Sequence, residues 1–97
     1  MYYLYILKCA DNSLYTGITN NLEKRIKNHN KGIASRYTRA RLPVEFVFIK
    51  SIENKNDALK EEIKTKKLAR KQKIELINSN ENKIKDYISI KKSLSFE

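Results

Sequence analysis

The sequence predicts a small α+β domain, in which a three-stranded, mostly antiparallel sheet is flanked by helices in the order β-β-α-β-α-α. Residues 2–8 are an unbroken aromatic and aliphatic run, which is typical of a strand covered on both faces. A turn cluster and a second β-rich run follow at 11–18, and apolar residues recur at helical spacing from residue 22. At 97 residues and 40% hydrophobic content, the chain fits one domain with a modest core.

The first two strands are predicted to form a β-hairpin around Asp11-Asn12-Ser13. Tyr5 and Tyr15 both have odd numbers, and side chains alternate between the faces of a strand. A loop of two or four residues would pair odd with even positions and send the two tyrosines to opposite faces. A shared role for Tyr5 and Tyr15 therefore predicts a turn of three or five residues, or a bulge.

A helix and a third strand are expected next. Thr19-Asn20 is predicted to cap a helix that runs to about Asn30, and Gly32 provides its C-terminal stop. Residues 33–42 have no clear periodicity and are predicted to be a basic loop. The β-branched and aromatic residues at 44–49 predict the third strand.

The remaining chain is predicted to be helical. Asn56 or Asp57 is expected to cap a helix whose inner side carries three apolar residues: Ala58, Leu59 and Ile63. The basic stretch 64–73 is expected to lead into a helix at about 71–77. A polar break then separates a domain at 1–77 from a C-terminal extension, 78–97, which can form a helix because four apolar residues have loosely helical spacing: Ile84, Tyr87, Ile88 and Ile90.

The charge of the chain predicts a polyanionic partner. The 21 basic residues outnumber the 11 acidic ones and give a formal net charge of +10. This favours nucleic acid or an anionic membrane surface, because phosphate contacts release counterions. An AT-rich genome, which raises Lys and Asn content generally, is the alternative explanation. The apolar N-terminal run is too short to span a membrane and lacks a preceding basic region, so we expect a cytoplasmic protein without a signal peptide.

Several chemistries are excluded by the residue content. One cysteine, Cys9, forms no internal disulfide. With a single histidine, His29, it cannot build a structural zinc site, which needs about four such ligands. Gly17 and Gly32 are the only glycines, so there is no glycine-rich phosphate loop.

Three short motifs in a fixed order resemble those of the GIY-YIG nuclease family, and in particular of its small single-domain bacterial members. The chain has Tyr3-Leu4-Tyr5 where the family has Gly-Ile-Tyr, and Tyr15-Thr16-Gly17 where it has Tyr-Ile-Gly. Arg25 matches the helix arginine of the family, and His29 matches its His-or-Tyr one turn later. Small members often lack the first glycine. The resemblance covers about residues 1–77.

The resemblance implies a metal-dependent phosphodiesterase with Glu62 as metal ligand. Helical spacing from Leu59 predicts that Glu62 lies beside the apolar side, whereas Glu61 points to solvent. An ion pair of Glu62 with Lys66, four residues on, is the alternative use of this carboxylate. Mg²⁺ or Mn²⁺ is the implied ion, because Mg²⁺ is bound by one or two carboxylates and keeps several waters.

The resemblance also implies catalytic roles for four further residues. Tyr5 deprotonates or orients the attacking water, Tyr15 orients water, and Arg25 offsets charge on the phosphoryl oxygens. His29 assists as base or leaving-group acid, and it shares a helix face with Arg25. A tyrosinate at Tyr5 needs nearby positive charge, which Arg25 supplies. The alternative is that the tyrosines are core residues and that the helix face is a solvated stripe.

Nucleic acid, DNA more than RNA, is the expected partner, in repair or processing. The backbone of that partner is expected to contact seven residues: Arg36, Tyr37, Arg39, Arg41, Lys66, Lys67 and Arg70. Tyr37 is expected to stack on an unpaired base. Two alternatives stay open, namely a non-catalytic nucleic-acid-binding module on the same scaffold and a ribosome- or RNA-associated basic protein with salt-steep, sequence-blind affinity.

Overall fold

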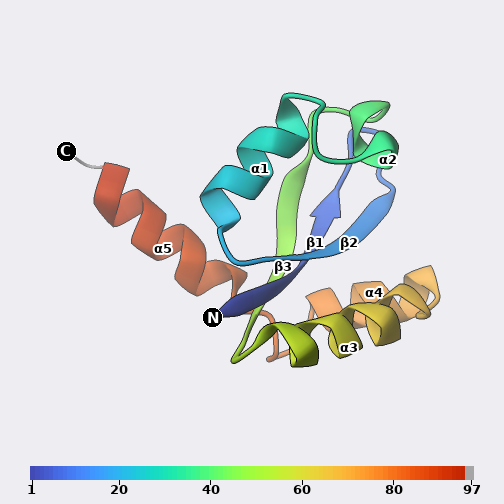
Figure 1. Ribbon diagram of the computed structural model, residues 1–97, viewed down its shortest axis with the longest axis vertical. Coiled ribbons are helices and arrows are strands. Elements are labelled where there is room, and N and C mark those ends of the chain that lie inside the picture. The colour runs from blue at the N-terminus through green and yellow to red at the C-terminus, as the bar shows by residue number, and fades with distance from the viewer. Residues whose placement is uncertain (96–97) are drawn as a thin grey trace.

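The computed structural model describes the backbone of residues 1–95 and the side chains of residues 1–89, so the Ile90 side chain lies outside the described residues. The described chain forms three strands and five helices (Figure 1). In chain order they are β1 (Tyr2–Lys8), β2 (Leu14–Thr19), α1 (Leu22–Asn30), α2 (Arg36–Arg39), β3 (Glu45–Ile52), α3 (Lys55–Lys66), α4 (Arg70–Ile77) and α5 (Ile84–Ser95).

The sheet is antiparallel, with the strand order β2-β1-β3, which confirms the predicted α+β class. Because β1 is central, its alternate side chains enter two cores. Leu4 and Ile6 pack with Phe48 on the face that α3 and α4 cover, whereas Tyr5 and Leu7 belong to the core under α1 and α5 (Figure 1). Each face of β1 is therefore buried, as its unbroken apolar run predicts.

The hairpin has the odd-numbered turn that a shared role for Tyr5 and Tyr15 requires. Residues 9–13 connect β1 to β2, and Tyr15 pairs with Leu7 while Gly17 pairs with Tyr5. Asn12 adopts a left-handed conformation (φ 67°) within this five-residue turn. Tyr5 and Tyr15 consequently lie on the same face of the sheet.

Helices α1 and α3 each begin at an asparagine other than the residues predicted to cap them. Asn21, rather than Thr19-Asn20, caps α1 by accepting a hydrogen bond from the Lys24 amide at 3.1 Å. Thr19 is instead the last residue of β2, and its hydroxyl accepts a bond from the Asn21 amide. Asn54, rather than Asn56 or Asp57, caps α3. At its other end α1 stops at Asn30 as predicted.

A short helix, α2, stands within the segment that was predicted to be a loop. The Ser35 hydroxyl caps it by accepting bonds from the Tyr37 and Thr38 amides at 3.1 and 3.4 Å. Four residues are too few to show a helical period, so the side-chain cap is the local signal for this turn.

The inner side of α3 differs from the prediction. Ala58 is fully buried, but Leu59 is 39% exposed and Ile63 is 57% exposed. Thr65, two turns beyond Ala58, is buried instead. The small side chain of Ala58 faces the sheet, and helical geometry then turns Leu59 and Ile63 outward.

The described part of the C-terminal extension packs on β3. The Asn82 side chain bonds the Ile49 amide at 3.2 Å and the Val47 carbonyl at 2.8 Å, and so anchors the segment before α5. The Tyr87 ring then meets Phe46 edge-on, with 5.8 Å between ring centroids. Among the described residues, no helix has the length and apolar character needed to cross a membrane.

Candidate active site

The hydroxyl of Tyr5, on the central strand, is hydrogen-bonded to two residues of α1. The Arg25 Nε–H donates a hydrogen bond to it at 3.0 Å, and His29 Nε2 lies 2.9 Å from it. The side chains of Tyr5 and His29 are fully buried, whereas Arg25 is half-buried. The predicted alignment of Arg25 and His29 on one helix face is confirmed, and Tyr5 is their common neighbour.

Gly17 makes room for the Tyr5 ring. A Cβ at Gly17 would lie 2.5 Å from the Tyr5 hydroxyl oxygen and 2.6 Å from Cζ, closer than real Cβ atoms approach. Gly17 is the β2 residue directly paired with Tyr5. The glycine of the second motif therefore lets the phenol lie flat across its neighbouring strand.

His29 is neutral at pH 7. Burial, followed by the positive charge of Arg25, lowers its pKa from 6.5 to about 4. Its second ring nitrogen, Nδ1, lies 2.9 Å from the hydroxyl of Thr38 in α2, a residue that is also fully buried. His29 is thus held between Tyr5 and Thr38, with both ring nitrogens hydrogen-bonded.

Tyr5 is a neutral phenol at pH 7, contrary to the tyrosinate expected from its charged neighbour. Burial raises its pKa, and this effect exceeds the lowering by the hydrogen bond and charge of Arg25. The effect of the Arg25 guanidinium on the Tyr5 pKa can be anticipated from the sequence. The larger effect of burial cannot, because burial of a strand residue depends on the whole fold. Ionisation of Tyr5 consequently needs a change in its surroundings, such as a bound cation.

The side chain of Glu62 is mostly buried, at 19% exposed, and pairs with Lys66 at 3.3 Å. Burial has the largest single influence on the pKa values of Tyr5 and Arg25. It raises the pKa of Tyr5 and lowers that of Arg25, but the pKa of Arg25 is raised overall because the hydrogen bond to Tyr5 and the nearby acidic groups outweigh burial. The negative charge of Glu62 raises both values. The structure therefore brings the Glu62 carboxylate within electrostatic reach of Tyr5 and Arg25.

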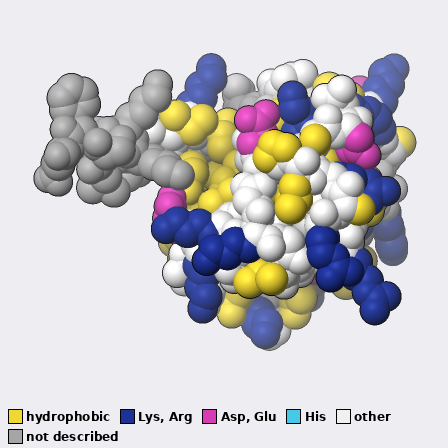
Figure 2. Space-filling view, turned by 90° about the horizontal axis from the view of Figure 1, so that it is seen from above, with side chains coloured by type: hydrophobic (Ala, Val, Ile, Leu, Met, Phe, Trp, Pro, Cys, Tyr) yellow, Lys and Arg dark blue, Asp and Glu magenta, His cyan; other side chains and the backbone are white. Residues whose placement is uncertain are grey.

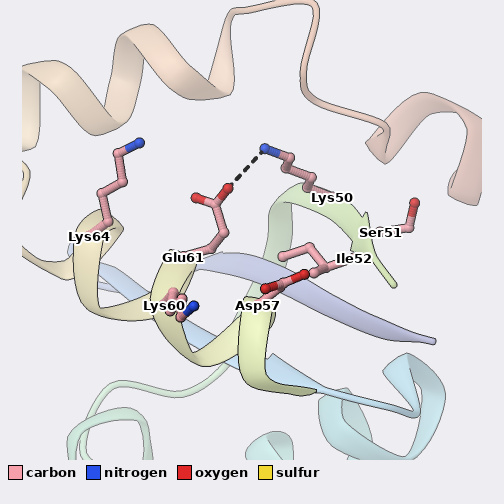
Figure 3. A pocket seen from close by; sticks show the side chains of 7 residues that line it. All are labelled: Lys50, Ser51, Ile52, Asp57, Lys60, Glu61 and Lys64. Carbon is pink, nitrogen blue, oxygen red and sulfur yellow. Dashed lines mark hydrogen bonds and ion pairs between the residues drawn. The ribbon is translucent and has the colours of Figure 1, made fainter. Parts of the chain in front are cut away.

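The carboxylate of Glu61 forms an ion pair with Lys50. Glu61 does not point to bulk solvent as predicted, because its carboxylate lies 3.5 Å from Lys50 Nζ (Figure 3). The same Lys50 ammonium pairs with Glu81 at 3.1 Å. These residues belong to the side of the sheet that α3 and α4 cover. Glu62 is therefore the carboxylate of α3 that acts on the Tyr5 cluster, which consists of Tyr5, Arg25, His29 and Thr38.

The donor set fits an ion that takes few protein ligands. In the described part of the chain, no three His, Cys, Asp or Glu side chains gather to hold a metal. A site with the single carboxylate of Glu62 suits Mg²⁺, which keeps several waters and takes phosphate oxygens as further ligands.

Consecutive ring contacts connect the buried His29, through Tyr15, to the exposed Tyr37. Tyr15 meets His29 edge-on at 5.4 Å and stacks with Tyr37 at 6.0 Å between centroids. The Arg41 guanidinium lies 3.9 Å from the centre of the Tyr37 ring and also pairs with Asp11 at 3.1 Å. Because Arg41 covers one face of Tyr37, a base that stacked there would have to displace the guanidinium.

The other expected nucleic-acid contacts are dispersed. Five of them are exposed: Arg36, Arg39, Lys66, Lys67 and Arg70. Figure 2 shows Lys and Arg side chains spread around the face that carries α1 and α2, without a single continuous basic patch. The charge of this face therefore offers a general attraction for polyanions, whereas Arg25 is the basic residue bonded within the cluster.

One residue of the cluster, Thr38, was not singled out from the sequence for any role. Threonine inside a basic stretch gives no periodic signal. Its position follows from the Ser35 cap of α2, which places the Thr38 side chain against α1.

The fold and this cluster define the chain as a member of the GIY-YIG family. The family model described as the GIY-YIG catalytic domain matches residues 1–75, which confirms the resemblance in the motifs. A divalent metal ion is the general requirement of nucleases in this family.

Relatives and a solved structure agree with this assignment. The UPF0213 protein CPE1444 of Clostridium perfringens (strain 13 / Type A) is 55% identical over 87 residues, covering 90% of this chain and 94% of that protein. The UPF0213 protein YazA of Bacillus subtilis (strain 168) is 44% identical over 81 residues, covering 84% and 82%. The solution NMR structure of the UPF0213 protein BH0048 from Bacillus halodurans has a TM-score of 0.55 at 36% identity, covering 87% of this chain and 90% of that one. These names state no activity.

Proposed function

We propose that the protein is a divalent-metal-dependent endonuclease that hydrolyses phosphodiester bonds, in DNA rather than RNA, during repair or processing. The observation that supports this most is the Tyr5 hydroxyl, bonded at 3.0 Å by Arg25 and at 2.9 Å to His29, with the Glu62 carboxylate acting on it. The net charge of +10 supports a polyanionic substrate.

In the proposed reaction, Glu62 is the residue that would hold Mg²⁺ or Mn²⁺, and the ion would supply positive charge to offset charge on the scissile phosphate. Arg25 uses Nε for Tyr5, so its two terminal nitrogens are the donors for the phosphoryl oxygens. Tyr5 is fully buried in the free protein, so its role as base requires that substrate binding opens its hydroxyl to water. Tyr5 then accepts a proton from the attacking water, and Tyr15 orients that water. Glu62, which pairs with Lys66 in the free protein, would have to give up that ion pair to hold the ion.

His29 acts through Tyr5 in this proposal. Its two ring nitrogens are bonded to Tyr5 and Thr38, so neither is left for direct contact with the substrate. At pH 7 the neutral imidazole accepts a proton from Tyr5 while Tyr5 receives one from water. The Arg25 guanidinium stabilises negative charge that develops on the phenol oxygen.

A second candidate is a nucleic-acid-binding module that keeps this scaffold without cleavage. The raised pKa of Tyr5 favours it, because a neutral phenol is a weak base. An RNA-associated basic protein is the third candidate, and its signature is affinity that falls steeply with salt on every sequence.

A matched pair of variants on α3 tests the enzyme. Single-stranded, duplex and branched DNA and the corresponding RNAs are incubated with Mg²⁺ or Mn²⁺. We expect Glu62→Gln to lower cleavage about 100-fold or more while binding is retained. Glu61→Gln changes the next residue, whose carboxylate serves Lys50, and leaves cleavage unchanged. Absence of cleavage by the unaltered protein on every substrate with both metals would select the binding module.

A further inference from the structure

Four consecutive hydrogen bonds connect the central strand β1 with α1 and α2. Arg25 Nε–H donates to the Tyr5 oxygen, and that oxygen lies 2.9 Å from His29 Nε2. His29 Nδ1 lies 2.9 Å from the Thr38 hydroxyl, which donates to the Ser35 carbonyl at 3.4 Å. The side chains of Tyr5, His29 and Thr38 are each 0% exposed, so in the substrate-free protein their partners are these protein groups.

A neutral imidazole can carry its proton on either nitrogen, and only one choice gives every proton of this chain an acceptor. With the proton on Nδ1, Tyr5 donates to Nε2, Nδ1–H donates to Thr38, and Thr38 donates onward to the Ser35 carbonyl. With the proton on Nε2, the Tyr5 oxygen accepts from both Arg25 and His29. The hydroxyl proton of Tyr5 then has no acceptor among its hydrogen bonds in the described structure.

We propose that Thr38 is a positioning residue that holds His29 as the Nδ1–H tautomer, and thereby makes Nε2 the acceptor for the Tyr5 proton. The tautomer stands on the hydrogen bonds alone, whereas its use in hydrolysis rests on the proposed function. In that use, binding of the substrate opens the Tyr5 oxygen, which is buried in the free protein, to the attacking water. As the water oxygen bonds to phosphorus, one of its O–H bonds breaks and the proton passes to the Tyr5 oxygen, while the former Tyr5 proton moves to His29 Nε2. The P–O bond to the leaving oxygen breaks in the same displacement, and the leaving oxygen takes a proton from solvent. The imidazolium that results keeps Thr38 as acceptor of its Nδ1–H.

The position of Thr38 is fixed before any substrate binds. Its amide and its hydroxyl are both tied to Ser35, which caps α2. The first turn of α2 therefore presents the Thr38 oxygen to Nδ1 in the free protein. A pre-set acceptor selects the tautomer without a rearrangement during the reaction.

Nitrogen NMR of the imidazole tests the tautomer directly. His29 is the only histidine, so ¹⁵N labelling gives one pair of ring signals without assignment. In the substrate-free protein at pH 7, we expect a protonated, pyrrole-type signal at Nδ1 and a pyridine-type signal at Nε2. Thr38→Ser keeps the hydroxyl and keeps this pattern. Thr38→Val leaves Nδ1–H without an acceptor. The protonated signal then either stays at Nδ1 with the shift of a proton that has no hydrogen bond, or moves to Nε2 at the expense of the bond from Tyr5, and both patterns differ from wild type.

Kinetics give a second readout if the protein cleaves nucleic acid. We expect Thr38→Val to lower kcat about tenfold, as the loss of one buried hydrogen bond implies, with KM within about twofold. Thr38→Ser restores kcat to within about twofold. Thr65→Val, a buried threonine facing the opposite side of the sheet, controls for general loss of packing and leaves kcat unchanged.

Two results overturn the proposal. One is a wild-type spectrum with the proton on Nε2, and the other is a Thr38→Val spectrum identical to wild type. If Thr38→Val does not fold, the wild-type and Thr38→Ser spectra still decide the tautomer. A protein that cleaves nothing but shows the Nδ1–H signals refutes the proposed function and leaves the tautomer assignment standing.

Discussion

The position of the Tyr5 side chain depends on the absence of a side chain at Gly17. Its ring approaches β2 closely because Gly17 has no Cβ, and its hydroxyl then reaches Arg25 and His29. Burial that raises the pKa of Tyr5 also excludes water from these bonds. The geometry of the phenol is therefore set by packing, and its chemistry by the charges around it.

Gly17→Ala should displace Tyr5. The added methyl group would overlap the phenol, and overpacking of this kind destabilises a core by about 1–3 kcal/mol. We expect a lower free energy of unfolding in urea and altered His29 ring signals, because Tyr5 moves away from Nε2. Gly32→Ala is the matched control. Gly32 has φ +79°, so an alanine there costs about 1 kcal/mol in backbone strain and leaves the His29 signals in place. Unchanged His29 signals in Gly17→Ala would contradict this account.

The buried His29 should make stability depend on pH. Its pKa is about 4 in the folded protein and 6.5 when unperturbed, so between these values the unfolded chain binds the extra proton. The free energy of unfolding therefore falls as the pH drops from 6.5 towards 4, by at most about 1.4 kcal/mol per pH unit, and is fully retained above 6.5.

Urea unfolding at several pH values from 5 to 7.5 measures this dependence. His29→Gln removes the titrating group and should flatten the curve in that range, where most carboxylates are already ionised. An equal slope in both proteins would show that other groups cause the dependence.

At the scale of single elements, the sequence predicted strands better than helix ends. The apolar run of β1 indicates the strand, and a shared role for Tyr5 and Tyr15 limits the hairpin to a turn of three or five residues or a bulge, because the period of a strand is two residues. The structure selects the five-residue turn. The caps of α1 and α3 were misplaced by one or more residues because several neighbouring Asn, Asp and Thr side chains compete for the same role. The choice among them depends on where the preceding strand or loop ends.

The orientation of α3 shows why the site was only partly predictable. Sequence spacing marked Leu59 and Ile63 as inward, but the buried positions are Ala58 and Thr65. A small residue permits close approach of helix and sheet, and this packing preference overrides the apolar count. Glu62 was placed at the site by its match to the family motif, whereas its partial burial follows from this rotation of α3.

The segment before α5 offers a test at this scale. The Asn82 side chain bonds the Ile49 amide and the Val47 and Ile77 carbonyls, so it links α4, β3 and α5. Asn82→Ala leaves these groups without their partner and should destabilise the protein by about 1–3 kcal/mol. Hydrogen exchange of the Ile49 amide should accelerate accordingly. Asn80→Ala changes an exposed asparagine nearby and should have little effect. Unchanged exchange at Ile49 in Asn82→Ala would be inconsistent with this anchoring.

Across the whole molecule, the predicted fold class and the family were confirmed, and the location of the charge was the least predictable property. The sequence gives a total of +10, but it does not show which basic side chains share a face. In the structure, Arg41 is held by Asp11 and Tyr37, whereas Arg36 and Arg39 are exposed beside it. Long-range contacts such as the one between Asp11 and Arg41 have no local signature in the chain.

Two double variants of equal charge test whether this face binds nucleic acid. Arg36→Gln with Arg39→Gln alters α2, and Lys83→Gln with Lys85→Gln alters the start of α5, on a different part of the molecule (Figure 1). If α2 contacts phosphates, the first pair should reduce the slope of log affinity against log salt by about 1–2 and the second should leave it unchanged. Fluorescence anisotropy with a labelled oligonucleotide measures both. Equal losses in the two proteins would mean that only total charge matters.

The groups around Tyr5 are spread along the chain, from β1 to Glu62 in α3. A ribosome therefore has to synthesise the chain beyond residue 62 before these groups can meet. A nascent chain that has released only the hairpin and α1 has its phenol, guanidinium and imidazole, but not the carboxylate. Translation itself delays the appearance of a complete set of reactive groups until α3 has been made.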